Sequence, residues 1–405
     1  MDLAAILVIG SSSEEPNATT ERSSASVGGE WVGVPYALLH VLGKPVLHRM
    51  IERLRDAGVQ AISVVTDSDY VPSSALQREG RLSEVNWIEA PATDYRQAVE
   101  EAYCDYAGLG FEDVLLMNLG PYAEFDVSDL LRFHRDTRQN ATLVYKQDAP
   151  ARIAIVNSRR RNDATFVLQN GLSKTRGPST IYQFNGYLNP LARANDLRRL
   201  AQDGLLLHCD LRPGGKEMKP GIWVAEYAHI HRTARVLAPC FIGASSKVRA
   251  AAVITRATSL EHHSEVDCNT VVEDASILPY TYLGPGLDIC HSVVGSRHIA
   301  HLVRNAQVEI LDSHLVGSVV ASASWRTVQN AASLASYLPR QFVRGLFAPS
   351  KSERPASLPS SVDGLSPAVK SSELARSTAA SHSEVEVLRG VRSREEIWGS
   401  VGPLS

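Results

Sequence analysis

A six-residue repeat constrains the fold of this 405-residue chain more than any other feature. From residue 230 onward, an aliphatic side chain recurs at eight consecutive positions six residues apart, and a small residue follows each one four positions later. The aliphatic positions are Ile230, Val236, Ile242, Val248, Ile254, Leu260, Val266 and Val272, and the small ones are Ala234, Cys240, Ser246, Ala252, Thr258, Ser264, Thr270 and Ser276. Neither an amphipathic helix nor a half-buried strand has this period. The repeat predicts a parallel β-helix, in which three units close a coil around stacked aliphatic side chains.

The repeat loses its phase around residues 279–286 and continues less regularly through Leu287, Ile289 and Val293. We place the predicted β-helix at 221–324 and a helical cap for its end at 325–348. Residues 349–405 are rich in Ser, Pro and Ala, a composition that buries too little apolar surface to offset the entropy of ordering. The sequence therefore predicts a disordered tail there.

Residues 1–220 alternate short apolar runs with helical periodicity, which is typical of βαβ units around a largely parallel sheet. Strands are expected at 3–9, 61–66, 113–117, 141–145, 153–157 and within 180–188, and helices at 46–57, 97–106 and 190–202. A further helix is expected to begin at Asp126 or Ser128, because either side chain can accept hydrogen bonds from the first free N–H groups. The fold class is therefore an α/β domain followed by a β-helix.

Composition excludes several classes of function. A net charge of -3 shows no excess of basic residues, so nucleic acid is not an expected partner. The five cysteines include no Cys-x-x-Cys pair, so neither a disulfide framework nor a zinc site is expected. The apolar start of the chain lacks a basic flank and is far shorter than the roughly 20 residues that span a bilayer. We expect a cytoplasmic protein without a membrane partner.

Three segments resemble the sugar-1-phosphate nucleotidyltransferase family. They are YALLHVLGKPVLHRMIERLRDAGV (36–59), DVLLMNLGPYAEFDVSDLLRFHRD (113–136) and YQFNGYL (182–188). The resemblance implies a Rossmann-like, GT-A-like domain and a β-helix that is left-handed. It also implies a setting in nucleotide-sugar or envelope polysaccharide synthesis, with a nucleotide or nucleotide-sugar as ligand and Mg²⁺ as cofactor if the chain is active.

The family's site residues map onto this chain only in part. The resemblance implies that the following residues contact substrate: Gly10, Ser11, Tyr36, Asn118, Gly120, Asn185 and Gly186. The family's glycine-rich loop, however, is replaced by Ser11–Glu15, its Pro-Lys pair by Pro35 and Tyr36, and its Asn-Gly-Asp turn by residues 118–120. The carboxylates expected nearest the site are Asp113, Asp126 and Asp129. We therefore predict a nucleotidyltransferase-like domain with a degraded site, and assign no catalytic or metal-binding residue.

Two alternatives remain open from the sequence. The chain could be a noncatalytic scaffold or regulatory subunit that binds a related enzyme. Hexapeptide-repeat domains also resemble acyltransferases, in which a histidine between coils acts as a general base. The candidates by position are His262, His263, His291, His298 and His301. For the nucleotidyltransferase-like protein, we expect a homo-oligomer formed through the β-helix.

Overall fold

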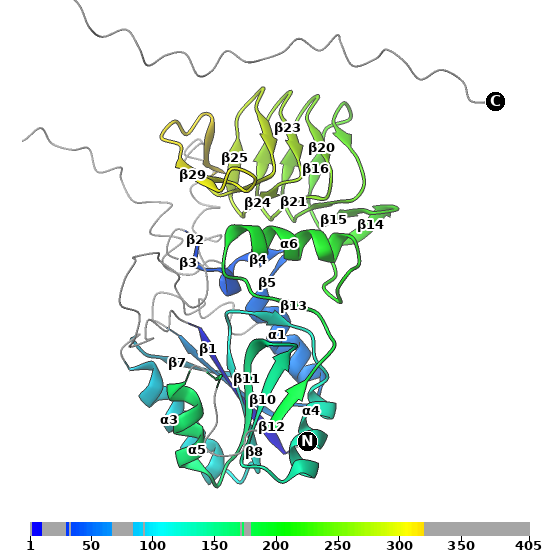
Figure 1. The fold of residues 1–405 in the computed structure, drawn as a ribbon. Helices are drawn as coiled ribbons and strands as arrows, with labels where there is room; N and C mark the ends of the chain where they lie inside the picture. Colours follow the sequence, from blue (N-terminus) through cyan, green and yellow to red (C-terminus); the bar gives the residue numbers. More distant parts are fainter. Residues whose placement is uncertain are drawn as a thin grey trace, which may run out of the picture. The chain divides into compact units, whose positions relative to one another are not determined.

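The computed structural model describes residues 2–9, 30–31, 34–66, 84–91, 94–170, 172–173 and 180–319 (Figure 1). All of them belong to one compact unit, Met1–Pro349. The predicted site residues Gly10 and Ser11, the predicted cap at 325–348 and the predicted tail lie outside the described residues. The described part is a mixed α/β structure, as the sequence predicts.

A seven-stranded sheet, consistent with a Rossmann-like domain, forms the first part of the fold. Its strand order is β12-β10-β11-β8-β1-β6-β7. The strands are β1 (Leu3–Ile9), β6 (Ala61–Thr66), β7 (Val85–Glu89), β8 (Asp113–Asn118), β10 (Ala141–Lys146), β11 (Ala149–Asn157) and β12 (Thr180–Gln183). Because β11 alone pairs antiparallel with its neighbours, the other six strands run in the same direction.

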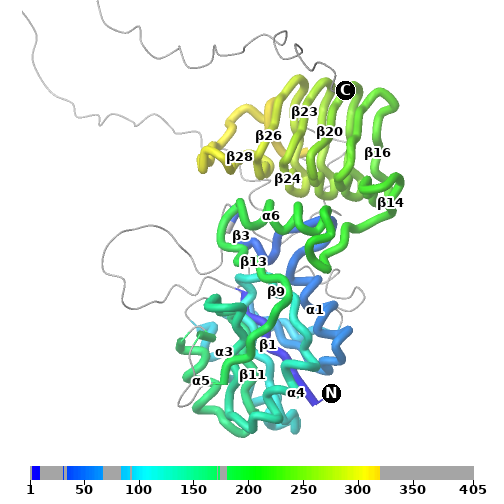
Figure 2. The backbone as a smooth tube through the Cα atoms, turned by 45° about the vertical axis from the view of Figure 1, so that its right-hand side comes forward, coloured from blue at the N-terminus to red at the C-terminus, as the bar shows by residue number. Residues whose placement is uncertain are grey.

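Helices cover both faces of this sheet, so its central strands are buried on both sides. Figures 1 and 2 show α1 and α4 on one side and α3 and α5 on the other. The helices are α1 (Val46–Asp56), α3 (Tyr95–Gly108), α4 (Val127–Thr137), α5 (Arg161–Gln169) and α6 (Ala194–Leu205), with the 3-10 helix η1 (Tyr36–Leu38). Alternate residues of β1 explain the two layers: Leu7 belongs to the cluster with Met50 of α1, and Ile6 to the cluster with Tyr103 of α3.

Short strand pairs connect these elements. They are β2 (Glu30–Trp31) with β3 (Val34–Pro35), β4 (His40–Val41) with β5 (Lys44–Pro45), and β9 (Tyr122–Ala123) with β13 (Leu188–Asn189). The predicted N-cap of α4 is confirmed, because the Asp126 carboxylate accepts hydrogen bonds from the N–H groups of Ser128 at 2.8 Å and Asp129 at 3.1 Å. Helix α5 was not predicted from the sequence.

Residues 216–318 form three sheets of short, mostly parallel strands, here called the strand stack. The first sheet contains β14 (Lys216–Lys219), β15 (Ile222–Val224), β18 (Cys240–Ile242), β21 (Thr258–Leu260), β24 (Ser276–Ile277), β27 (Ser292–Val294), β28 (His298–His301) and β29 (Ala306–Glu309). The second contains β16 (His229–Ile230), β19 (Lys247–Val248), β22 (Glu265–Val266), β25 (Thr281–Leu283) and β30 (Val316–Ser318). The third contains β17 (Arg235–Val236), β20 (Val253–Thr255), β23 (Val271–Glu273) and β26 (Asp288–Cys290).

The six-residue repeat explains this arrangement. Residues of the repeat pair across coils three units apart, as Val236 does with Ile254 and Val248 with Val266. Six of the eight repeat residues, Ile242 through Val272, are fully or almost fully buried in one cluster inside the stack. Ile230 is 39% exposed, because it belongs to the first coil, which has no coil before it to cover its side chain.

From the corner at Asp274 onward the coils are one residue shorter than before, and this is why the repeat loses its phase. Ile254 pairs with Val272, 18 residues later, whereas Leu260 pairs with Ile277, 17 residues later. The missing residue therefore falls between 272 and 277, at the corner that contains Asp274. That corner turns with Asp274 alone in the left-handed region, at φ 48°.

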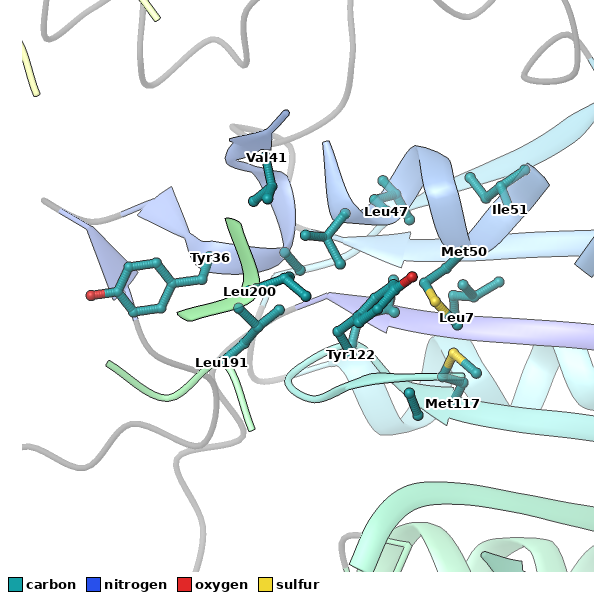
Figure 3. Close-up of a cluster of buried hydrophobic side chains, with 14 of the residues drawn as sticks. Leu7, Tyr36, Val41, Leu47, Met50, Ile51, Met117, Tyr122, Leu191 and Leu200 are labelled. Atoms are coloured by element: carbon teal, nitrogen blue, oxygen red, sulfur yellow. The ribbon is translucent and has the colours of Figure 1, made fainter. Parts of the chain in front are cut away.

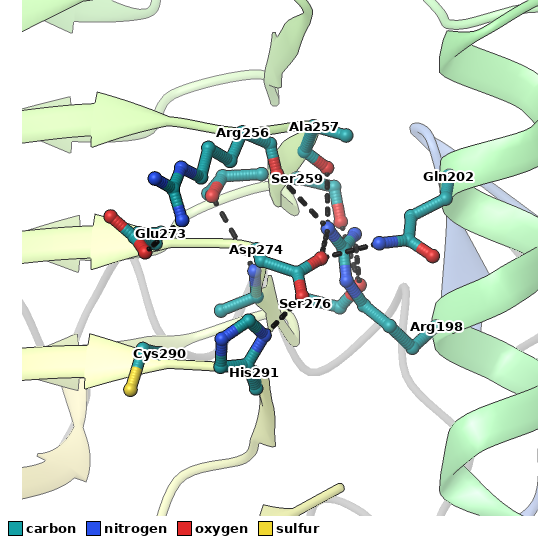
Figure 4. A network of polar contacts seen from close by, with 12 residues as sticks. Arg198, Gln202, Arg256, Ala257, Ser259, Glu273, Asp274, Ser276, Cys290 and His291 are labelled. Atoms are coloured by element: carbon teal, nitrogen blue, oxygen red, sulfur yellow. Dashed lines mark hydrogen bonds and ion pairs between the residues drawn. The ribbon is translucent and has the colours of Figure 1, made fainter. Parts of the chain in front are cut away.

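A buried arginine joins α6 to this shortened corner (Figure 4). Arg198 donates hydrogen bonds to the Asp274 carboxylate and to the carbonyl of Ala257, both at 2.8 Å. Gln202, one turn later on α6, and His291, in the next coil, also bond to Asp274. A guanidinium this deeply buried is stable only with such partners, so α6 and the stack pack against each other in a single orientation.

Candidate functional site

The α/β sheet changes direction between β1 and β8. From β1 the chain adds β6 and β7 on one side, and then returns to add β8 on the other. In sheets of this kind, ligands bind where the carboxyl ends of the strands diverge. These ends are Ile9 and Asn118, and the N–H of Leu119 donates to the carbonyl of Val8 at 2.9 Å. The predicted site residues Asn118 and Gly120 therefore lie at the expected edge.

At the ends of β1, β6 and β8 the described side chains carry no charge, while Glu89, at the end of β7 beside Thr66, carries a carboxylate. Asn118 offers an amide, and Thr66, at the end of β6, offers a hydroxyl that is buried without a hydrogen-bond partner in the described structure. Magnesium in phosphoryl-transfer sites is held by carboxylates and phosphates. The described ends of β1, β6 and β8 therefore supply no carboxylate to hold a magnesium ion. Among the residues that the structure describes, no group of three or more His, Cys, Asp or Glu side chains could hold a metal.

Asp113 stands at the opposite edge of the sheet, because it begins β8 where Asn118 ends it. Its carboxylate accepts a hydrogen bond from Arg135 Nε at 2.9 Å and lies 3.5 Å from His134 Nε2. Burial alone would raise the pKa of Asp113, but hydrogen bonds from His134 and Arg135 hold it below its usual value. Asp113 thus fastens α4 to the sheet and does not line the carboxyl edge.

The other two candidate carboxylates are also committed to local contacts. Asp126 caps α4. Asp129 accepts a hydrogen bond from the Tyr182 hydroxyl at 2.6 Å, and the bonds from Tyr182 and Arg132 hold its pKa below the usual value. Both residues are therefore explained by helix capping and by the attachment of β12 to α4.

Tyr36 lies inside the apolar cluster on the α1 face of the sheet (Figure 3). Its ring stands at one edge of that cluster beside Leu191 and Leu200. Burial raises the pKa of the Tyr36 phenol above its usual value, and the negative charge of Asp196 adds to the effect. The phenol therefore stays neutral, and the structure does not bring it together with Asn185 and Gly186.

Two adjoining hollows of about 520 and 430 Å³ lie where β10 and β12 end. They share Glu124, Asn185 and Gly186. The first is also lined by Arg53, Phe125, Asp126, Tyr182 and Phe184, and the second by Lys146, Tyr187, His208, Asp210 and Arg212. Aromatic rings beside polar groups of both charges suit a polyhydroxylated ligand, which presents both C–H surfaces and hydroxyl groups.

Gly186 is required by the close approach of two chain segments in this hollow. A Cβ atom added at Gly186 would lie 1.8 Å from the carbonyl oxygen of Glu124. The Glu124 side chain is itself held in place, because it accepts hydrogen bonds from the Tyr122 hydroxyl at 2.8 Å and from the N–H of Asp210. The floor of the hollow is therefore preorganised.

Glu124 and Lys146 are lining residues that the sequence analysis missed. Lys146 ends β10, and Glu124 directly follows β9. The available signal was their position just after strands that end at the edge where ligands bind. Lys146 lies outside the three segments that resemble the family, and Glu124 lies within the segment 113–136 but is not among the residues that the resemblance implies contact substrate.

The five candidate histidines do not gather into one site. His262 is buried between the rings of His40 and Tyr280, with ring centroids 4.2 and 5.0 Å away. His291 bonds through Nδ1 to Asp274 and is half exposed. His263, which stacks on Tyr280, and His298 and His301, in β28, complete the set.

Comparison with known proteins adds no family to these observations, since the chain matches no protein-family model and no curated protein. None of the helices in the described ranges is long and apolar enough to cross a membrane.

Proposed function

We propose that this chain is a sugar nucleotidyltransferase-like protein that binds a nucleotide or nucleotide-sugar without efficient turnover. In this proposal residues 1–220 form the GT-A-like domain and residues 221–324 a left-handed parallel β-helix. The strand order, with its switch point between β1 and β8, supports the first assignment. The pairing of residues 18 or 17 positions apart in three sheets supports the second, although β14 joins the stack slightly before residue 221.

The observation that carries the proposal is the contrast between two parts of one sheet edge. The hollow at Asn185 and Gly186 has a closely packed floor and polar side chains along its walls. At the ends of β1, β6 and β8, the described groups that would meet a triphosphate carry no positive charge, namely Asn118, Thr66 and the backbone of Gly120. In this proposal the edge therefore keeps groups that can bind a ligand and lacks the positive charges that nucleotidyl transfer requires.

Charge explains why turnover would be lost first. Nucleotidyl transfer builds negative charge on the reacting phosphate, and that charge must be met by cations or N–H groups in place before the reaction. Losing one such group typically costs about 3 to 4 kcal/mol of transition-state stabilisation, which is a hundred- to thousandfold in rate. A buried neutral phenol at Tyr36 and an amide at Asn118 remove two of them.

In this proposal the β-helix serves self-association in a cytoplasmic assembly. Two of its three sheets do not pack against the α/β domain, and repeat folds commonly present such faces to partners. The same faces would serve a noncatalytic scaffold role, which is the second proposal carried over from the sequence.

A two-part assay tests the proposal. Purified protein is incubated with sugar-1-phosphates, each nucleoside triphosphate and Mg²⁺, and pyrophosphate is measured; the same ligands and the nucleotide-sugars are screened by thermal shift. We expect a ligand-dependent rise in the melting temperature with little pyrophosphate, because binding stabilises by mass action even without chemistry. Replacing Asn185 by Ala should remove the shift, whereas Gln60→Ala, outside the hollow, should keep it. Rapid pyrophosphate release would refute the degraded site, and the absence of any shift would refute the binding role.

A further inference from the structure

The third sheet of the strand stack presents an unusual row of side chains to solvent. In its four strands Arg235 pairs with Val253, Val253 with Val271, and Val271 with Asp288. Their chain neighbours Val236, Ile254, Val272 and Ile289 point into the stack. Since side chains alternate along a strand, the row Arg235-Val253-Val271-Asp288 faces outward.

The two charges at the ends of this row have no ion pair among the described residues. Arg235 and Asp288 are both exposed, and three strand spacings of about 4.8 Å keep them roughly 14 Å apart. The half-buried valines lie between them. The row therefore has a positive end, an apolar middle and a negative end.

The other two faces of the stack already make contacts within the chain. The first sheet packs against the α/β domain, as the shared cluster of Phe241 and Val293 with α6 residues shows. On the second sheet, opposite charges stand on neighbouring strands and pair there. The ion pairs are Lys247 with Glu265 and Arg249 with Glu265 and with Asp267, and the Tyr282 hydroxyl also donates a hydrogen bond to Asp267. Only the third sheet carries unlike charges at opposite ends of an otherwise uncharged row.

We propose that the third sheet is a self-association face, on which a second copy of the chain docks about a two-fold axis parallel to the strands. Such an axis keeps each row opposite itself and reverses the order of its residues. Arg235 then meets Asp288 of the second copy, and Val253 meets its Val271, each contact occurring twice. This deepens the self-association proposed above and does not depend on any ligand.

The second outward row on the same sheet agrees with this arrangement. Thr255 pairs with Glu273, and Glu273 with Cys290, while Leu237 stands at the end of the row and is 45% exposed. Reversing that row places the Thr255 hydroxyl opposite the Glu273 carboxylate, and Leu237 opposite Cys290. No like charges meet in either row.

The area of the face indicates how tightly the two copies should bind. Four strands of two or three residues cover on the order of a few hundred Å² per copy, at the low end of specific interfaces. The dimer should therefore be weak and depend on protein concentration. Sedimentation velocity from about 5 to 500 µM covers the range expected of such an interface.

Charge reversal gives a sharp test with the full-length chain. Arg235→Glu places Glu against Asp twice, and Asp288→Arg places Arg against Arg twice, so each variant alone should remain monomeric where the wild type dimerises. An equimolar mixture of the two variants should dimerise again, because each contact then joins opposite charges. The double variant Arg235→Glu/Asp288→Arg should also recover. Lys219→Glu, which has the same change of charge in β14 of the first sheet, is the control and should behave as wild type.

The outcomes separate this proposal from the broader one. A wild-type chain that is monomeric at every concentration overturns both the face and the proposed self-association. A wild-type oligomer that persists unchanged in both single variants overturns this face alone. Loss of association in the single variants without recovery in their mixture overturns the reversed pairing of Arg235 with Asp288.

Discussion

The carboxylate of Glu261, in the strand stack, accepts a hydrogen bond at 2.7 Å from the backbone N–H of Leu42, which lies 219 residues earlier in the chain. Its second oxygen accepts the N–H of Gly43 at 2.9 Å. Leu42 and Gly43 both have positive φ, at 52° and 96°, and consecutive N–H groups in such a turn form a small anion-binding concavity. The turn before α1 is thereby fastened to the stack.

Glu261→Gln should change how stability depends on pH. Burial raises the pKa of Glu261 to about 7, although the N–H groups of Gly43 and Leu42 oppose the rise. The folded chain therefore binds this proton more tightly than the unfolded chain, and wild-type stability from this group is full below pH 4.5 and is lost as pH rises through 7. Relative to wild type, the Gln variant should gain up to about 3 kcal/mol between pH 4.5 and 8. Urea denaturation at both pH values measures this, and a constant difference would contradict it.

His262→Phe should protect the fold against acid. Burial lowers the pKa of His262 to about 3, with a smaller contribution from His263, and burial also lowers that of the stacked His40 well below its usual value. Depressed histidine pKa values mean that the unfolded chain binds more protons, so stability falls as pH drops below about 6.5. Removing one such ring should recover on the order of 3 kcal/mol at pH 4 relative to pH 7. The matched control is His231→Phe, which replaces an exposed histidine ring by the same residue.

Arg198→Met should weaken the attachment of α6 to the stack. The variant leaves Asp274 without its principal cation, which in buried pairs typically costs about 3 to 5 kcal/mol. Arg199→Met is a matched control on the next residue: its side chain is 75% exposed and should change stability by less than about 0.5 kcal/mol. Adding Asp274→Asn to the Arg198 variant should recover part of the loss. If the double variant is no more stable than the single one, the pair is not coupled.

Gly186→Ala should lower the stability of the fold around the hollow. The added methyl group collides with the Glu124 carbonyl, so one of the two segments must move, at a cost of about 2 to 4 kcal/mol. Gly108→Ala at the end of α3 meets no atom within 4 Å and serves as the control. Chemical denaturation reports the difference. Equal stability of the two variants would show that the segments around Gly186 yield easily.

The periodic parts of the fold could be predicted from the sequence, whereas the contacts between distant segments could not. Spacing alone identified Ile242 and Leu260 as inward-facing, because every coil imposes the same requirement on them. Val293 was expected to continue that series, yet it packs against the α/β domain and Val294 faces inward, since the corners at Asp274 and at His291 are each one residue shorter than the corners of the regular repeat. No local pattern could reveal the shift.

The candidate site was predictable only where a strand ends. Asn118, Gly120, Asn185 and Gly186 were found through motifs that accompany strand ends, and they lie at one edge of the sheet. Asp113 was expected near the site because it shares a segment with Asn118. The two residues nevertheless stand at opposite ends of a six-residue strand. Because a strand is extended, it places its first and last residues at opposite edges of the sheet.

The carboxylate at the Asp274 corner has a consequence for assembly of the chain itself. A perfectly regular array offers the same corner at every level, so a helix that recognised one corner could settle one level too high or too low. The corresponding corners of the neighbouring levels turn at Arg256 and Ala257 and at His291, whereas the middle one turns at Asp274, whose carboxylate bonds Arg198. The Asp274 side chain therefore fixes the level of the stack at which α6 packs.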